Sequence, residues 1–311
     1  MGQRAQLDFG LTVRPSPHGG SLNEMSRAND RLLDAATAHD LTCWVIDHFQ
    51  FDNRVPIFEC LSFLAFLAGQ HPGLRWGTLV LGQAYRNPAL VGKMAATLQM
   101  LTRGRFVLGM GAGDAADEHH AYGYPFPSGR VRLEQLAEAA TIVRLLWQGG
   151  PASFEGQHYR IDRAYCLPRP EPPPILMLGG GGERQTLRVV ARHADWWNCD
   201  YYSPTEYAHK LSVLHAHCEA IDRDPASVLP TCYVGLTVGY DESRLVRRRS
   251  MGHRGEVHVV AGTPAEVVDH LQAFAEAGVR HMQLNFLDFP RLESLELFLA
   301  DVLPHFTRTR L

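Results

Sequence analysis

Candidate acid–base residues follow two predicted strands of this 311-residue chain. Asp47 and His48 stand at the end of the apolar run Cys43–Asp47, and Asp114 follows a second run, Phe106–Met110. A histidine can hold, donate or accept a proton near neutral pH, and a neighbouring carboxylate can orient it or a bound ligand. The residue types therefore allow a catalytic His48, and they equally allow a histidine with a structural hydrogen bond.

Glycines also gather at two predicted strand ends. Gly179–Gly182 follows the apolar run Ile175–Leu178 and precedes a helix expected over Glu183–His193. Free backbone N–H groups beside a helix N-terminus favour an anion such as a phosphate, although glycine-rich turns also occur without a ligand. A second segment, Gly109–Gly113, lets a flat ligand approach the backbone closely, or lets another element pack there.

The element that must position these residues is Leu74–Gly113. It is predicted to form a strand over Leu74–Leu81, a helix over Pro88–Leu101 and a second strand over Phe106–Met110. Such strand–helix–strand units build parallel sheets, and parallel-sheet enzymes place their sites at the C-terminal ends of strands. The polar and glycine-rich segments are therefore expected to meet at one face.

Eight apolar β-runs alternate with helices, a pattern typical of a closed (β/α)8 TIM barrel. An open doubly wound sheet is the alternative, but its glycine-rich dinucleotide loop after the first strand matches FGLTVRPSPHGG poorly. Because side chains alternate along a strand, Trp196 and Trp197 are expected to point to opposite faces. The runs are Gln6–Val13, Cys43–Asp47, Leu74–Leu81, Phe106–Met110, Ile175–Leu178, Ala194–Asn198, Pro230–Tyr240 and His281–Phe286.

Helix ends are marked by capping residues. Ser26 is the expected N-cap of a first helix that ends at His39. Thr263, followed by Pro264 and by Glu266, predicts a capping box at the start of another helix. The last helix is expected over Arg291–His305.

A single barrel domain is expected over residues 1–311, with two insertions at its C-terminal face. Residues 151–174 are rich in proline, which predicts irregular or hairpin structure. Residues 241–255 are polar and rich in arginine. They are interpreted as a solvated insertion or, alternatively, as a lid over a substrate pocket.

Composition narrows the function classes. The formal net charge of −3 gives no basic balance that would suggest nucleic acid as a partner. The sequence contains no apolar run of about 18 residues, so no membrane span is predicted. The first ten residues, MGQRAQLDFG, lack the apolar core of a signal peptide. The six cysteines form no C-x-x-C pair, so we expect a reduced, cytoplasmic protein.

Metal and hydrolase chemistry are disfavoured by the spacing of their candidate residues. The run from Glu118 through His119 to His120 lacks metalloprotease spacing. His215 and His217 lie two apart on a predicted helix and do not face one site. No Gly-x-Ser-x-Gly elbow occurs, so we expect neither a metal site nor an α/β-hydrolase.

Several segments together resemble the bacterial luciferase-like monooxygenases over roughly Leu7–Phe306. The most specific are RWGTLVLGQAYRNPALVGKMAATLQMLTRGRFVLGMGAG, EHHAYGYPFPSGRVRLEQLAEAATIVRLLW and GTPAEVVDHLQAFAEAGV. The resemblance implies a (β/α)8 barrel, often dimeric, that binds FMN or the deazaflavin coenzyme F420 at its C-terminal face. VIDHFQ and GMGAGD are similar to the F420-dependent branch of the family.

The resemblance implies an F420-dependent oxidoreductase that transfers a hydride between the deazaflavin C5 and a small organic substrate. Asp47 would lie beside the deazaflavin ring, His48 would transfer the coupled proton and Asp114 would contact the substrate. Relatives that oxidise sugar phosphates carry the longer Glu at the position of Asp114, so the resemblance gives weaker support to a sugar-phosphate substrate than to the cofactor.

Cofactor contacts are also implied by the resemblance. The branch has a non-proline cis peptide behind the ring, and the matching bond here is Leu79–Val80. Asn87 stands where many relatives have His. The full set of implied cofactor residues is Asp47, Leu79, Val80, Asn87, Gly111, Gly113, Asp117, Gly179, Gly180 and Gly181.

Two other functions stay open at this stage. One is an FMN-dependent monooxygenase that uses reduced flavin and O2, and the other is a non-catalytic flavin-binding barrel. F420 and FMN binding would separate the first from the leading hypothesis. Family resemblance also implies a homodimer.

Overall fold

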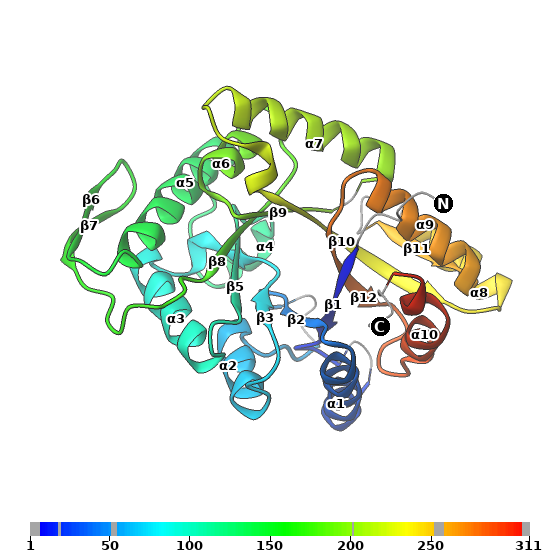
Figure 1. Cartoon of the computed structure of the whole chain (residues 1–311). Coiled ribbons are helices and arrows are strands. Elements are labelled where there is room, and N and C mark those ends of the chain that lie inside the picture. Colours follow the sequence, from blue (N-terminus) through cyan, green and yellow to red (C-terminus); the bar gives the residue numbers. More distant parts are fainter. Residues whose placement is uncertain (1–6, 18–19, 51–54, 201, 252–257, 307–311) are drawn as a thin grey trace.

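Parallel strands close into a barrel in the computed structural model, which describes residues 7–17, 20–50, 55–200, 202–251 and 258–306 (Figure 1). Pairing runs in the order β1 (Asp8–Val13), β2 (Thr42–Val45), β3 (Trp76–Thr78), β5 (Phe106–Gly111), β8 (Ile175–Gly179), β9 (Trp196–Cys199), β10 (Leu229–Val238) and β12 (His281–Phe286), which pairs back with β1. The predicted closed TIM barrel is confirmed, and the doubly wound alternative is not.

Helices pack around the barrel, most of them on its outer side (Figure 1). They are α1 (Leu22–His39), α2 (Cys60–Gln70), α3 (Pro88–Leu101), α4 (Ala116–Ala121), α5 (Gly129–Leu146), α6 (Thr186–His193), α7 (Pro204–Glu219), α8 (Glu242–Met251), α9 (Pro264–Glu276) and α10 (Glu293–Leu297). Short 3₁₀ turns cover Gln83–Tyr85, Pro225–Ser227 and Leu303–His305. Within the described ranges, no helix is long and apolar enough to span a membrane.

Capping predictions had mixed outcomes. The capping box of α9 is confirmed, with Thr263 as N-cap and its side chain bonded to Glu266. The prediction that Ser26 caps α1 is wrong, because Ser21 forms a capping box with Glu24 and the helix begins earlier. The last helix also differs from the continuous one predicted. A wide π-type turn, Phe298–Val302, follows α10, because Pro304 just beyond has no N–H for a regular helix.

Two strands were not predicted as such. β11 (Val259–Gly262) pairs with the C-terminal half of β10, and its four residues are too few to show a period. The run expected over Leu74–Leu81 is split, because β3 ends at Thr78 and β4 (Leu81–Gly82) resumes pairing with β5. Between them lies the non-proline cis bond Leu79–Val80, so the predicted cis peptide is confirmed.

The two excursions are more regular than expected. Within 151–174, β6 (Ala152–Glu155) and β7 (Arg160–Ala164) form an antiparallel hairpin separate from the barrel sheet, which projects from its side (Figure 1). Within 241–255, residues 242–251 form α8 rather than an irregular insertion, while 252–255 lie outside the described residues. That this segment forms a lid over the pocket therefore remains a prediction from the sequence.

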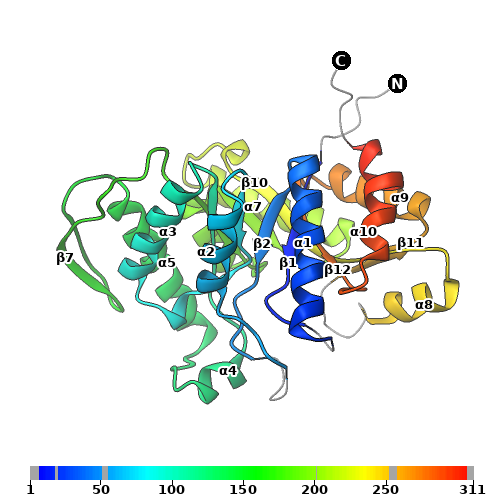
Figure 2. The same cartoon turned by 90° about the horizontal axis from the view of Figure 1, so that it is seen from below.

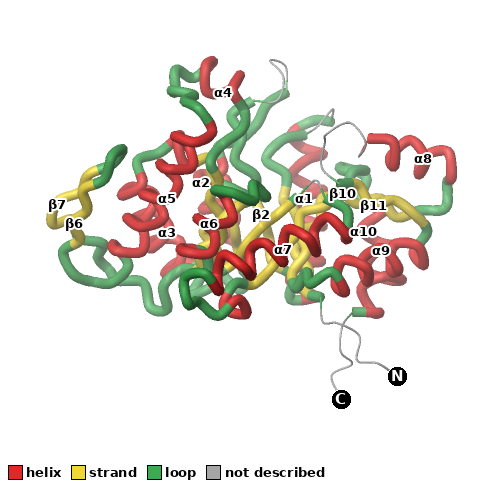
Figure 3. The backbone as a smooth tube through the Cα atoms, turned by 90° about the horizontal axis from the view of Figure 1, so that it is seen from above, coloured by secondary structure: helices red, strands yellow, loops and turns green. Residues whose placement is uncertain are grey.

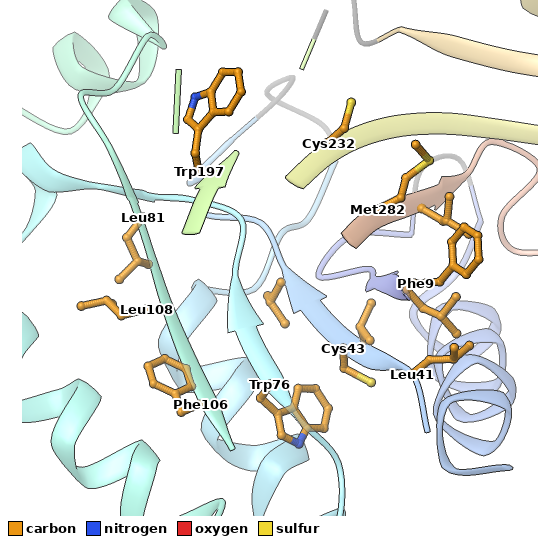
Figure 4. Close-up of a cluster of buried hydrophobic side chains, with 14 of the residues drawn as sticks. Phe9, Leu41, Cys43, Trp76, Leu81, Phe106, Leu108, Trp197, Cys232 and Met282 are labelled. Carbon is orange, nitrogen blue, oxygen red and sulfur yellow. The ribbon is translucent and has the colours of Figure 1, made fainter. Parts of the chain in front are cut away.

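Alternation along the strands divides the core into two layers. Outward-facing residues such as Phe9, Cys43 and Trp76 pack between the strands and the helices (Figure 4). Inward-facing residues such as Trp44, Val107 and Trp196 fill the lower barrel. The predicted split of the tryptophan pair is confirmed, since Trp196 lies in the inner cluster and Trp197 stacks on Tyr207 outside.

Candidate active site

A cavity of about 1030 Å³ opens at the C-terminal ends of the strands. α4 and α8 lie at this end of the barrel (Figures 2 and 3). Inward-facing positions become small near the top of β5 and β8, where Gly111 and Gly179 follow the bulky Val107 and Met177. The barrel is thus filled below by large side chains and left open above.

His48 follows β2 and is held by a carboxylate that was not predicted. Its Nδ1 lies 2.7 Å from Oε1 of Glu118 on α4, and the Glu118 side chain is only 6% exposed. The other oxygen of Glu118 accepts from the Phe49 N–H at 3.1 Å and from the Tyr85 hydroxyl at 3.2 Å. Because Nδ1 bonds Glu118, a proton exchanged between His48 and a ligand would pass through Nε2.

This pairing sets the protonation of both partners. Burial alone lowers the pKa of His48, but the hydrogen bond and charge of Glu118, with the charges of Asp114 and Asp47, raise it above its ordinary value. Burial raises the pKa of Glu118, but the hydrogen bond and charge of His48, together with the bonds from Phe49 and Tyr85, lower it below its ordinary value. A charged Glu118 therefore stabilises a protonated His48.

Asp47 occupies a different environment from the one expected of a cofactor contact. Both of its oxygens bond Arg86 at 2.8 Å, and Oδ2 also accepts from the Gly82 N–H at 3.0 Å. Arg86 in turn bonds Glu59, the N-cap of α2. The Asp47 side chain is 0% exposed, so its carboxylate ties the end of β2 to β4 and α2. It lines the cavity without offering a free carboxylate oxygen to a ligand.

A nearly side-chain-free surface, which we call the glycine wall, consists of Leu79, Val80, Gly111, Gly179 and Gly180. A Cβ atom at Gly111 would lie 2.8 Å from Cγ2 of Val80, and one at Gly179 would lie 3.3 Å from it. Val80 can occupy this position only because both neighbours are glycines. The predicted residues Leu79, Val80, Gly111, Gly179 and Gly180 are therefore brought together in one surface.

The glycine-rich loop after β8 leads into α6 later than predicted. The helix begins at Thr186, not at Glu183, whose carboxylate instead bonds Lys210. Gly180 has a φ of 118°, a conformation that favours glycine. The first turn of α6 has no side-chain cap, and Thr186 lines the cavity. The Leu187 N–H bonds the Gly182 carbonyl at 3.0 Å, so an anion at this turn would be bound by other N–H groups of the loop and the helix start.

The remaining predicted site residues separate into two groups. Asp114 and Gly113 line the cavity beside the glycine wall. Asn87, Asp117 and Gly181 do not belong to its lining. Asn87 is the N-cap of α3 and accepts from the Ala89 N–H at 2.9 Å, which explains its position before Pro88 without a ligand.

Several residues in or beside the cavity have no recognisable signal in the sequence. Glu118 was considered only as a metal ligand, and its spacing of 70 residues from His48 gave no local signal. Asp200 follows β9, and burial, with a smaller contribution from Asp114, raises its pKa to about 7. Arg14 follows β1, Tyr233 lies in the middle of β10 and Asn285 lies near the end of β12, and no motif links the three. The described residues hold no cluster of His, Cys, Asp or Glu suited to a metal ion.

Comparisons with known proteins identify the family of this chain. The sequence profile described as luciferase-like monooxygenase matches residues 16–255. A protein from Kineococcus radiotolerans named F420-dependent glucose-6-phosphate dehydrogenase is 28% identical over 97% of this chain and 97% of its own length. One from Mycobacterium tuberculosis named F420-dependent hydroxymycolic acid dehydrogenase is 31% identical over 75% of this chain and 67% of its own.

A solved structure shares the fold. It is described as an F420-dependent secondary alcohol dehydrogenase in complex with an F420–acetone adduct, and it superposes with a TM-score of 0.83. The sequence identity is 18%, and the match covers 97% of this chain and 100% of that one. At this identity the likeness concerns the fold alone.

Proposed function

This chain belongs to the luciferase-like monooxygenase family, and we propose that it is an F420-dependent oxidoreductase of that family. The relatives named F420-dependent dehydrogenases support this assignment. The reaction is hydride transfer between the deazaflavin C5 and a small organic substrate in the cavity. When bound, F420 supplies the hydride chemistry, so the protein contributes position, proton transfer and electrostatics.

The glycine wall fits a flat tricyclic ring. Leu79 and Val80 form its base, and the absence of side chains at Gly111 and Gly179 lets a planar ligand approach the backbone. The loop after Gly180 and the uncapped first turn of α6 would hold the cofactor phosphate, through N–H groups other than those of Gly180 and Leu187, which already bond the carbonyls of Asn198 and Gly182. Asp114, at the edge of this wall, would orient the substrate.

The observation that carries the proposal is the His48–Glu118 pair next to this wall. Glu118 fixes the ring of His48 through Nδ1, at 2.7 Å, and keeps it protonated to higher pH. Nε2 of His48 is then placed to give a proton to the substrate oxygen during reduction or to take it during oxidation. Asp47 acts as an anchor for Arg86 rather than as a partner in this step.

Cofactor titration tests the proposal directly. F420 fluorescence should change saturably on addition of the protein, with FMN binding far weaker. His48→Gln should keep F420 affinity within about twofold while abolishing turnover in a screen of alcohols and carbonyl compounds. Tight FMN binding without F420 binding would instead support the flavin monooxygenase. Unchanged turnover by His48→Gln would remove its proposed role.

We further infer a cytoplasmic homodimer. α2 and α3 expose large apolar side chains, among them Phe66 at 62% and Leu101 at 56%, on neighbouring helices, a surface that a second copy would cover. All six cysteines are free and buried, as suits a reducing compartment. Light scattering should report a dimer for the native chain and a monomer for Phe66→Glu. A monomeric native chain would contradict the inference.

A further inference from the structure

A second polar surface lies across the cavity from the glycine wall. We call it the polar wall, and it consists of Arg14, Tyr233, Asn285 and Arg248. Its strands, β10, β12 and β1, are neighbours in the barrel, and the pairing order places them opposite β3, β5 and β8. A substrate bound over a cofactor on the glycine wall would therefore meet the polar wall with its other end.

Two guanidinium groups converge on one loop of the polar wall. Arg14 lies over the ring of Phe289, with its Cζ 5.7 Å from the ring centroid. Arg248 donates from Nη2 to the carbonyl oxygen of Leu287 at 2.8 Å. Leu287 and Phe289 both follow β12 and both line the cavity, so the two cations border the same part of it.

Tyr233 and Asn285 present hydrogen-bonding groups between these cations. Nδ2 of Asn285 donates to the Tyr233 hydroxyl oxygen at 2.7 Å, which leaves the phenolic hydrogen to donate elsewhere. Oδ1 of Asn285 is buried and has no hydrogen-bond partner among the described residues. Asn285 is 6% exposed, and an unpaired buried acceptor is costly unless a ligand supplies a donor.

The acidic groups of the cavity come from other elements of the fold than the two arginines. Asp114 follows β5 and Asp200 follows β9, while Asp47 is neutralised by Arg86. The nearest carboxylate behind the polar wall, Asp288, does not line the cavity; it accepts from the Ser294 N–H at 2.8 Å and lies 3.4 Å from Arg244. Asp114 therefore lies away from the two cations, while Asp200 borders the polar wall on the Tyr233 side, since Cys199 and Cys232, the residues before them, pair in the sheet.

We propose that the polar wall binds a carboxylate group of the substrate, so that the substrate is an alcohol or carbonyl compound that also carries a carboxylate. This inference rests on the proposed function. Guanidinium groups match the planar geometry of a carboxylate, and the Tyr233 hydroxyl adds a third donor. Asn285 Oδ1 accepts from a neighbouring O–H or N–H of the same molecule. A phosphate dianion fits less well, because Asp114 and Asp200 share the cavity.

Calorimetry with matched ligands tests this assignment. Hydroxy acids, their primary amides and their phosphate-ester counterparts are titrated into the protein with and without F420. The acid should bind at least about tenfold tighter than its amide, since hydrogen bonds to charged groups are the strong ones. Arg248→Gln and Tyr233→Phe should each reduce this acid-to-amide ratio by about threefold or more. Arg247→Gln, the same charge change at an exposed neighbour on α8, should leave the ratio unchanged.

The outcomes are separable from those of the proposed function. Equal binding of acid and amide, or a ratio unaffected by both Arg248→Gln and Tyr233→Phe, would overturn the carboxylate assignment. Tighter binding of the phosphate ester than of the acid would overturn it as well. Failure of the native protein to bind F420 would instead contradict the proposed function, while the acid-to-amide ratio of the cofactor-free protein would still decide the role of the polar wall.

Discussion

The glycine wall and the polar wall of the cavity present different chemical groups. The glycine wall presents backbone and the aliphatic side chains of Leu79 and Val80, supported by Gly111 and Gly179. The polar wall presents guanidinium, phenol and amide groups on long side chains. A backbone surface is set by the fold itself, whereas a side-chain surface changes with each substitution. The first suits a ligand shared by a family, and the second suits a ligand particular to one member.

The two walls also differ in the contacts that hold them in place. Buried ionic contacts of Asp47 and Arg86 fix the ends of β2 and β4 behind the glycine wall. The contacts of the polar wall include the bond from Arg248 to the Leu287 carbonyl and the bond from Asn285 to Tyr233, which involve no buried pair of opposite charges. Substitutions behind the glycine wall should therefore cost more than substitutions on the polar wall.

The largest effect is expected from Arg86→Met. This change leaves the carboxylate of Asp47, 0% exposed, without its partner, and breaking a buried ion pair costs about 3–5 kcal/mol. The free energy of unfolding from urea denaturation should fall by that amount. Arg130→Met, which breaks an exposed pair with Glu134, should change it by less than about 0.5 kcal/mol. A similar loss in the two variants would mean that the buried pair is not a special support.

Gly111→Val should weaken F420 binding by about 100-fold, because its side chain overlaps Val80 and the ring position. Fluorescence titration measures the affinity, and circular dichroism checks that the barrel is retained. Gly69→Val, at a position with nothing within 4 Å of an added Cβ, is the matched control and should bind F420 normally. Normal F420 affinity of Gly111→Val would place the cofactor elsewhere.

Glu118→Gln should reduce turnover by about 10–100-fold without changing F420 affinity, as for loss of a residue that orients a reactive group. Because Glu118 raises the pKa of His48, its loss should also move the pH profile of kcat to lower pH. Glu134→Gln, at an exposed carboxylate, is the control. A turnover loss with an unmoved pH profile would point to a structural role only.

Asp200, between the two walls, should make stability depend on pH. Its pKa of about 7 in the folded protein lies above the unfolded value, so its stabilising contribution is present below about pH 4 and is lost as pH rises through 7. Asp200→Asn should therefore be more stable than the native protein at pH 8, on the order of 2 kcal/mol. The exposed control Asp117→Asn should follow the native pH trend. Parallel trends for all three proteins would remove the buried-acid explanation.

The same contrast explains how far the sequence could predict this molecule. The glycine wall was found because its residues follow strands in short motifs, and the resemblance supplied the Leu79–Val80 bond. The long strands are predicted by their runs of apolar residues, and α3 is predicted by Pro88 in its first turn. The polar wall was missed because its members are single residues far apart in the chain. Only closure of the barrel brings Arg14 near Asn285.

Specific tertiary or local contacts explain the other differences between the predicted and the observed structure. Glu118 acts on His48 through a tertiary contact that no spacing rule describes. α1 starts at Leu22 because Ser21 and Glu24 satisfy its N-terminus, while Ser26, the predicted cap, lies inside the helix. The first turn of α6 was placed too early because Glu183 favours helix in general, yet here it bonds Lys210. In each case a specific contact outweighs the propensity.

A crystal structure of the protein with F420 tests the contrast between the walls most directly. The deazaflavin ring should lie against Leu79 and Val80, with its phosphate near Gly180 and the first turn of α6, and no cofactor atom should contact the polar wall. Nε2 of His48 should face the space above C5. A ring or phosphate bound against Arg14 and Tyr233 would contradict the account.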